Sequence, residues 1–244
     1  MAGSLTREAF LGDMNLHGMG PTPEPQGFWD LLTGTEQSVL SDLGRMSVFP
    51  PGGTLCVEGD PATHVFILVA GWVKILAVTS EGQEMVLALR GNGDIVGELA
   101  EATGYRTATV QAAGTVRALI VGHDKFSSFL DSYLGASQAY RRFLTQRWSD
   151  TAAMLRRRSG TSGAQRLAFL LLDLAGQPGT GMADDVYVTM PLSQEDLASL
   201  AGTSRATVTR ALGNWRRRGF IRTGQRRITI MDPGALRQIA GHPA

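Results

Sequence analysis

The stretch LSQEDLASLAGTSRATVTRAL, residues 192–212, decides the fold of the C-terminal part of this chain. Ser193 is followed three residues later by Asp196, a pattern that caps the start of a helix. Apolar residues recur at helical spacing on both sides of Gly202, which can end the first helix, and Ser204 can cap a second one. Helix, glycine turn and helix are the parts of a helix-turn-helix, whose second helix reads base edges in the major groove of DNA.

The charge of the chain is divided between its two parts. Residues 203–227 hold eight arginines and no Asp or Glu. Residues 1–140 hold seven Lys and Arg against fifteen Asp and Glu, a net −8, whereas residues 141–244 hold sixteen against seven, a net +9. A basic half of this kind indicates a surface for DNA phosphates. The alternative is an ordinary helical hairpin with a solvated basic face.

Composition excludes several classes of protein. No apolar run reaches the ~18 residues of a spanning helix, and no signal peptide is evident, so we expect a cytoplasmic protein with no membrane partner. The single cysteine, Cys56, excludes an intramolecular disulfide and an iron–sulfur cluster, and makes cysteine-ligated haem improbable. The four histidines show no metal-ligand spacing, so no metal is expected. Without a nucleophile elbow or a Walker loop, an enzyme is not expected either.

The N-terminal half is predicted to start with a flexible tail over residues 1–26, which is rich in Gly, Pro and Met. Residues 27–134 then form a domain in which short β-rich runs alternate with glycine-containing turns. Strands at such close spacing indicate a barrel or a sandwich. The expected strands are 54–57, 65–69, 73–79, 84–89, 108–112 and 116–120.

Residues 135–160 are predicted to form a long helix and a hinge at Ser159-Gly-Thr-Ser-Gly163. The apolar stripe of this helix is wider than a lone surface helix needs, so we expect a second copy to pack on it in a homodimer. The residues expected at this dimer seam are Tyr140, Phe143, Leu144 and Trp148. Alternatively, the stripe packs only on the β-rich domain of its own chain.

Residues 161–244 are predicted to form the DNA-binding domain. Behind the helix-turn-helix, the runs 220–222 and 227–231 flank Thr223-Gly-Gln-Arg226, which predicts a hairpin, the wing of a winged helix. The residues expected to contact DNA are Ser204, Arg205, Ala206, Thr207, Thr209, Arg210, Arg216, Arg226 and Arg227.

These parts in this order resemble the CRP/FNR family of bacterial transcription regulators. The resemblance covers residues 28–239 and rests on segments whose order and spacing are specific together. They are 51–60 (PGGTLCVEGD), 66–74 (FILVAGWVK), 93–99 (GDIVGEL), 106–109 (RTAT), 192–197 (LSQEDL) and 204–208 (SRATV). The resemblance implies an α+β fold: an N-terminal cyclic-nucleotide-binding β-roll, a long dimerisation helix and a C-terminal winged helix-turn-helix domain.

The family's phosphate-binding cassette is similar to the segments 97–99 and 106–107. By this resemblance Arg106, aided by Thr107, would bind the cyclic phosphate and Glu98 a ribose hydroxyl, while the long helix would present Thr151 to the base. The chemistry suits these residues, because arginine offers a planar charged fork and a glycine lets the backbone approach the ligand. The ligand-binding residues expected are Gly97, Glu98, Leu99, Arg106, Thr107 and Thr151.

Three departures from the family pattern bear on the ligand. Glu98 and Arg106 are eight residues apart, which trims the cassette, and Ala152 replaces the second hydroxyl residue of many cyclic-AMP sensors. Arg90 stands where an apolar residue is common, and it either enters the nucleotide pocket, serves another ligand or lies on the surface. Glu98 and Arg106 can also be a salt bridge in a β-roll that binds nothing.

The resemblance implies a dimeric, sequence-specific transcriptional regulator controlled by a small ligand, cyclic AMP or a related nucleotide. Its expected partners are a palindromic operator in double-stranded DNA and, for an activator, RNA polymerase. Arg205 and Arg210 stand where family members read guanine, although both can also contact phosphates alone. The alternatives are a regulator with a degenerate pocket or a different ligand, and an accessory protein whose winged helix binds protein.

Overall fold

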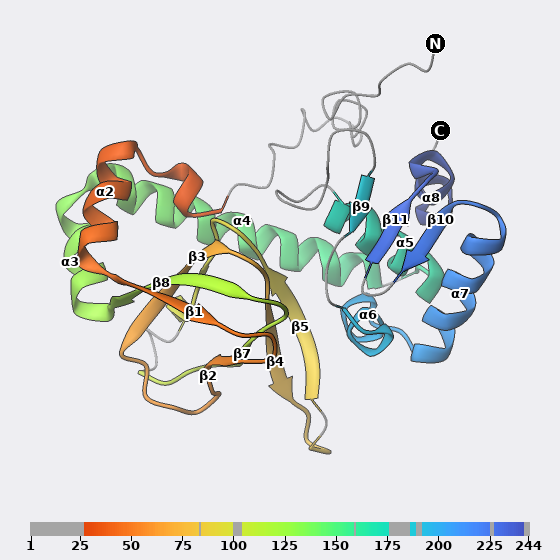
Figure 1. Cartoon of the computed structure of the whole chain (residues 1–244), viewed down its shortest axis with the longest axis horizontal. Coiled ribbons are helices and arrows are strands. Elements are labelled where there is room, and N and C mark those ends of the chain that lie inside the picture. Colours follow the sequence, from red (N-terminus) through yellow and green to blue (C-terminus); the bar gives the residue numbers. More distant parts are fainter. Residues whose placement is uncertain are drawn as a thin grey trace, which may run out of the picture. The chain divides into compact units, whose positions relative to one another are not determined.

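The computed structural model describes residues 27–82, 84–99, 104–158, 160–175, 186–188, 192–224 and 227–241, with no side-chain description for residues 157, 158, 186–188 and 227. The chain divides into two compact units, Gln26–Ser159 and Gly160–Ala244. Figure 1 gives the course of the chain and the labels of its elements. No helix in the described part of the chain is long and apolar enough to cross a membrane.

The N-terminal unit is built from strands framed by helices. Its helices are η1 (Trp29–Leu31), α2 (Gly34–Leu43), α3 (His123–Ser132) and α4 (Leu134–Arg158). Its strands are β1 (Arg45–Phe49), β2 (Thr54–Cys56), β3 (His64–Ala70), β4 (Val73–Val78), β5 (Glu84–Arg90), β6 (Ile95–Val96), β7 (Thr109–Ala112) and β8 (Val116–Gly122). They form two four-stranded antiparallel sheets, in the orders β1-β8-β3-β6 and β2-β7-β4-β5.

Strand β3 explains how this unit holds two apolar cores. Its side chains alternate between the faces of the sheet, and both faces are covered. Phe66 and Leu68 join the core shared with the second sheet, whereas Val65 and Ile67 pack in the core under the helices. All four side chains are buried, which is why the strand reads as a continuous apolar run.

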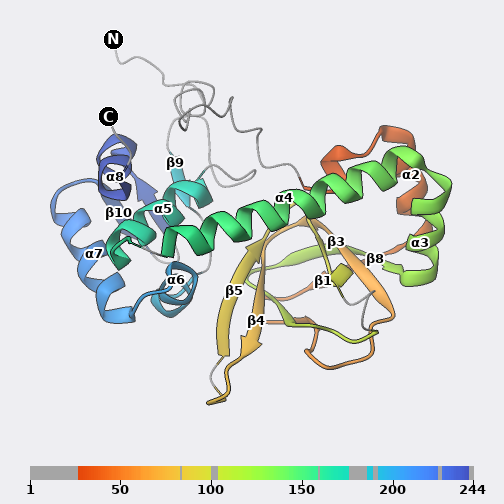
Figure 2. The same cartoon turned by 180° about the vertical axis from the view of Figure 1, so that it is seen from behind.

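Helix α4 starts inside the helical core of this unit. Tyr140 meets Phe28 and Phe126 edge to face, at 5.8 and 5.5 Å between ring centroids, and Phe143 is buried. In Figure 2, α2 and α3 lie beside the first turns of α4. This part of the apolar stripe is therefore covered by the helix's own unit.

The C-terminal unit contains α5 (Gly163–Ala175), β9 (Val186–Val188), α6 (Gln194–Ala201), α7 (Arg205–Arg217), β10 (Ile221–Gly224), β11 (Arg227–Ile230) and α8 (Pro233–Ala240). Its antiparallel sheet has the order β10-β11-β9, so the hairpin of the wing pairs with the strand before the helix-turn-helix. The α+β architecture expected from the sequence is confirmed.

Local signals place the two helices of the helix-turn-helix. The Ser193 side chain accepts from the Asp196 N–H at 3.0 Å while the Asp196 carboxylate accepts from the Ser193 N–H at 2.7 Å, a complete capping box. Gly202 ends α6 with φ +59°, the left-handed conformation that favours glycine. Ser204 then caps α7 by accepting from the Thr207 N–H at 3.2 Å.

Arg166 on α5 ties this turn to the segment before the helix. Its Nε donates to the carbonyl of Ala201 at 2.8 Å and its Nη2 to that of Gly202 at 2.7 Å, at the end of α6. Its Nη1 donates to the carbonyl of Thr161. One guanidinium thus satisfies carbonyls that the helix end leaves without a partner inside the helix.

Candidate ligand site and nucleic-acid interface

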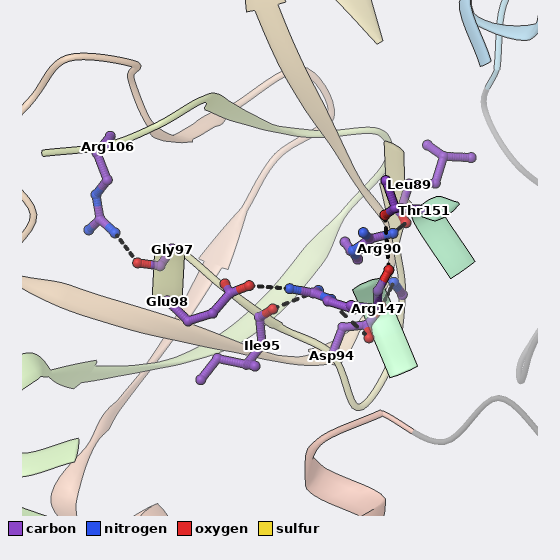
Figure 3. Close-up of polar contacts among 10 residues, drawn as sticks. Leu89, Arg90, Asp94, Ile95, Gly97, Glu98, Arg106, Arg147 and Thr151 are labelled. Atoms are coloured by element: carbon purple, nitrogen blue, oxygen red, sulfur yellow. Dashed lines mark hydrogen bonds and ion pairs between the residues drawn. The ribbon is translucent and has the colours of Figure 1, made fainter. Parts of the chain in front are cut away.

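The ligand site predicted from the sequence centres on Gly97, which follows β6. Gly97 has φ +84°, and a Cβ on it would lie 2.4 Å from Nη1 of Arg106. Glycine is therefore required for both the backbone conformation and the close approach of the arginine. Nη1 of Arg106 donates to the Gly97 carbonyl at 3.2 Å, as drawn in Figure 3.

Arg106 is a buried cation with spare donor capacity. Its residue exposure is 4%, and its guanidinium carbon lies 5.5 Å from the centroid of the Phe66 ring. Its backbone is fixed by the bond from its N–H to the Asp60 carbonyl at 2.9 Å and by the Gly59 N–H, which donates to the Arg106 carbonyl at 2.9 Å. Its Nη2 is buried and finds no acceptor among the described residues.

Glu98 is also buried, at 4% exposure, but its partner is not Arg106. It forms an ion pair with Arg147 of α4, whose Nη1 donates to Oε1 of Glu98. Nη2 of Arg147 donates to the Ile95 carbonyl at 2.8 Å and lies 3.9 Å from Oδ1 of Asp94. The alternative of a Glu98–Arg106 salt bridge is therefore wrong, because the carboxylate is held by a cation from the long helix.

Arg147 is the site residue that sequence reasoning missed. Its guanidinium carbon lies 4.5 Å from the centroid of the Phe143 ring, so the arginine packs on an aromatic residue of the apolar stripe of α4. A signal was available in its spacing: Arg147 precedes Thr151 by four residues, which puts both on one helix face. Thr151 itself is exposed, and its hydroxyl donates to the Arg147 carbonyl at 2.9 Å.

Arg90 and Asp94 lie beside this ion pair (Figure 3). Burial, reinforced by repulsion from Arg147, lowers the pKa of Arg90 to about 10. Burial raises the pKa of Asp94, opposed by Arg147 and Arg90. Oδ2 of Asp94 accepts from the Gly91 N–H at 2.9 Å, which holds the carboxylate against the turn before β6.

The structure brings together three of the six predicted ligand-binding residues: Gly97, Glu98 and Arg106. Leu99 is 61% exposed, and Thr107 is exposed as well. The ionic groups at this site now include three arginines and two carboxylates, since the half-buried Arg90, Arg147 and Asp94 join the buried Glu98 and Arg106. Such a cluster has one positive charge in excess and is suited to a small anion.

Most of the predicted DNA-contacting residues of the second unit lie at the start of α7, whereas Arg216 lies in its last turn. Val208, Ala211, Leu212 and Trp215 bury the other face of this helix. The exposed residues of the set are Ser204, Arg205, Ala206, Thr209, Arg210 and Arg216, and Thr207 is half-buried. Arg226 lies outside the described residues, and Arg227 starts β11 without a described side chain.

Contacts between α6 and α7, and one within α7, orient the exposed side chains of α7. Nε of Arg205 lies 3.9 Å from Oε2 of Glu195, and both side chains are 70% exposed. A pair this exposed contributes at most ~1 kcal/mol, so Arg205 is free to exchange it for another partner. The hydroxyl of Thr209 donates to Oε1 of Gln194 at 2.6 Å, and Nη2 of Arg210 donates to Oγ1 of Thr207 at 3.4 Å.

The residues predicted for the dimer seam differ in exposure. Phe143 is buried, and Tyr140 and Leu144 pack against the same core of the N-terminal unit. Trp148 is 77% exposed, and one further heptad along α4 Leu155 is 58% exposed. The packing of the stripe on its own chain thus applies to its first half, and the second half is left uncovered in the described chain.

Residues 46–133 match the family model of the cyclic nucleotide-binding domain, and residues 165–239 match that of the Crp-like helix-turn-helix domain. A "CRP-like cAMP-activated global transcriptional regulator" of Mycobacterium tuberculosis is 32% identical over 210 residues, which cover 84% of this chain and 94% of that protein. The "Global nitrogen regulator" of Synechococcus elongatus is 30% identical over 197 residues, covering 80% and 89%. Among solved structures, FixK2 from Bradyrhizobium japonicum shares the fold with a TM-score of 0.73 at 18% identity, covering 82% of this chain and 99% of that chain. The chain therefore belongs to the CRP/FNR family of transcriptional regulators.

Proposed function

We propose that this transcriptional regulator changes its affinity for DNA when a cyclic nucleotide binds between Glu98 and Arg106. The observation that carries the proposal is the buried Nη2 of Arg106, which has no acceptor among the described residues. An unsatisfied charged donor is costly to bury, and a phosphate oxygen would satisfy it. Cyclic AMP is the effector in the name of the Mycobacterium tuberculosis relative.

Each predicted residue has a role in this proposal. Arg106 binds the cyclic phosphate, with a hydroxyl from Thr107 and backbone N–H groups near Gly97 and Leu99 as further donors. Glu98 accepts from a ribose hydroxyl. Because Arg147 already holds that carboxylate, a bound sugar shares or displaces the arginine, and the contact transmits binding to α4 and Thr151. A ligand shifts an equilibrium only through such a difference in contacts between two states.

Isothermal titration of the whole protein with cyclic AMP and cyclic GMP tests the proposal. Arg106→Ala should abolish binding, because a buried phosphate loses its charged partner at a cost of about 3–5 kcal/mol. Glu98→Ala should weaken binding less. Arg117→Ala, which removes an exposed arginine from β8, is the matched control and should bind as wild type. Binding that survives Arg106→Ala would refute the assignment.

A second candidate is a regulator whose pocket is degenerate and needs no cyclic nucleotide. It is favoured by the ion pair between Glu98 and Arg147, which occupies the proposed ribose acceptor. In that case no cyclic nucleotide binds at millimolar concentration, and Arg106→Ala and Glu98→Ala leave operator affinity unchanged.

For DNA recognition we propose a homodimer that joins through the exposed second half of α4, where Trp148 lies. Two copies of α7 would then enter successive major grooves about 34 Å apart on a palindromic operator. Arg205 and Arg210 would bond to guanine O6 and N7, a contact worth roughly 1–3 kcal/mol of discrimination. Ala206 cannot accept a hydrogen bond from a cytosine amino group. The base preference at the position that Ala206 faces should therefore be relaxed or favour thymine.

Selection of binding sites from random DNA tests this code. The expected half-site keeps two guanines, and variants of Arg205 or Arg210 lose preference at one of them. Half-sites without paired guanines, or a strict cytosine opposite Ala206, would contradict it. The proposal places the protein in the cytoplasm, with RNA polymerase as a further partner if the bound dimer activates transcription, and assigns it no enzymatic role.

A further inference from the structure

Arg90 is a cation near the ligand site to which the proposed function gives no role. It ends β5 opposite Val73 of β4, and its Nη1 donates to the carbonyl of its own neighbour Leu89 at 2.7 Å. Within the described part of the chain, no carboxylate lies within ion-pair distance of this guanidinium. The side chain is half-buried, and the only hydrogen bond from its guanidinium to a described residue is the one to Leu89.

The surroundings of Arg90 favour an incoming acceptor. Arg147 repels it, while Asp94, Glu98 and Asp150 attract it without lying within ion-pair distance, and the first two are paired with Arg147. Burial and this repulsion both lower the pKa of Arg90, so its charged form is disfavoured where it lies. A ligand that offers two acceptors to the fork would relieve this cost.

Arg90 lies where the base of a cyclic nucleotide bound at Arg106 and Glu98 is expected. In Figure 3, Arg106 lies on one side of Glu98, and Arg90 lies on the other side, next to Arg147 and Thr151 of α4. A cyclic nucleotide presents its phosphate, its sugar hydroxyl and its base in the same order. With the phosphate at Arg106 and the ribose at Glu98, the base is directed toward Arg90.

We propose that Arg90 reads the base and selects a 6-oxopurine, guanine or hypoxanthine, over adenine. A guanidinium fork matches the O6 and N7 acceptors of guanine, a bidentate contact that arginine makes on base edges elsewhere. Adenine offers the N7 acceptor beside the N6 amino donor, so one N–H of the fork would face another donor. This selection rests on the proposed function, since it requires a cyclic nucleotide at Arg106.

Isothermal titration of the full-length chain with cyclic GMP, cyclic IMP and cyclic AMP tests the selection. Wild type should bind cyclic GMP and cyclic IMP at least about tenfold more tightly than cyclic AMP. Arg90→Leu should bring the three affinities within about twofold of one another. Arg90→Lys, which keeps the charge and loses the fork, should lose most of the preference. The exposed Arg117→Leu is the matched control and should keep the wild-type ratio.

Different results would refute base selection by Arg90 and nucleotide binding at Arg106. Binding of cyclic AMP as tight as that of cyclic GMP, or a preference that persists in Arg90→Leu and Arg90→Lys, overturns the role of Arg90 and leaves the site at Arg106 standing. Absence of binding for all three nucleotides to wild type overturns the proposed function. Cyclic IMP is the decisive ligand: it lacks the 2-amino group of guanine, so weak binding of cyclic IMP beside tight cyclic GMP refutes recognition through O6 and N7.

Discussion

Replacing Arg166 by Met should destabilise the C-terminal unit and disturb DNA binding. The thioether side chain keeps most of the unbranched stem and removes all three contacts of the guanidinium, to the carbonyls of Thr161, Ala201 and Gly202. The contacts to Thr161 and Ala201 are partly buried, and the one to Gly202 is exposed. The loss should therefore come mainly from two charged hydrogen bonds.

The magnitude follows from these contacts. A hydrogen bond to a charged group contributes about 1.5–3 kcal/mol, and we take the lower value because water can reach this helix end. Two such bonds give about 3 kcal/mol of unfolding free energy. For a unit of this size, 1 kcal/mol shifts the midpoint by about 4–8 °C, so the expected fall is roughly 12–24 °C.

Differential scanning calorimetry of the full chain measures this change. The transition that rises on addition of operator DNA identifies the C-terminal unit, since a ligand stabilises the unit it binds. Arg166→Lys should recover about half of the loss, because one ammonium still interacts with the end of α6. Arg222→Met, an exposed change on β10, is the control. A fall below about 1 kcal/mol in Arg166→Met would refute the reasoning, because the two partly buried bonds alone should exceed it.

Three further predictions concern the other surfaces of the molecule. Trp148→Asp places a charge on an exposed face of α4 and should give a monomer with weak operator binding in analytical ultracentrifugation and gel-shift assays, whereas a dimer of wild-type affinity would contradict the seam. Arg205→Ala should cost about 1–3 kcal/mol of discrimination at one base, while Arg216→Ala should weaken all sequences alike and reduce the salt dependence, as competition titrations at several salt concentrations can measure. Burial, together with Arg106, lowers the pKa of His64 below 6.5, so the unfolded chain binds more protons and the N-terminal unit should lose stability as the pH falls through 6.5. His64→Gln should lack this part of the loss in urea titrations at pH 7.5 and 5.5, and an unchanged pH dependence would exclude His64 as its source.

The parts of the fold with local signals were predictable from the sequence. The capping pair at Ser193, the turn at Gly202 and the second cap at Ser204 each act within four residues, so the helix-turn-helix follows from its own stretch. The sequence contains no clear signal for strands β1 and β6. Residues of β1 are exposed or half-buried and do not alternate strongly, and β6 has only the two residues Ile95 and Val96, too few for a periodic pattern.

The ligand site was predictable only in part, because Arg147, the residue that was not predicted, is far from the others in the sequence. Glu98 and Arg106 lie in one short cassette, but Arg147 reaches Glu98 across 49 residues. Periodicity placed Phe143 on an apolar stripe without identifying which surface covers it, and the structure assigns it to the core of its own unit. A pattern of side chains specifies that a face is buried, and the partner depends on tertiary packing.

The anchoring of Arg106 has a consequence for how the cassette varies between related proteins. The Arg106 N–H bonds to Asp60 and its guanidinium to Gly97, while the Ala62 N–H donates to the Gly104 carbonyl at 2.9 Å. The ends of the segment between Gly97 and Arg106 are thus bonded to each other, and its second end is also bonded to the segment that holds Asp60 and Ala62. Lengthening an eight-residue connection by two residues then costs only about 0.2 kcal/mol of closure entropy. Closure entropy alone therefore opposes a change in the length of this segment only weakly, so the length can differ while the arginine stays in place.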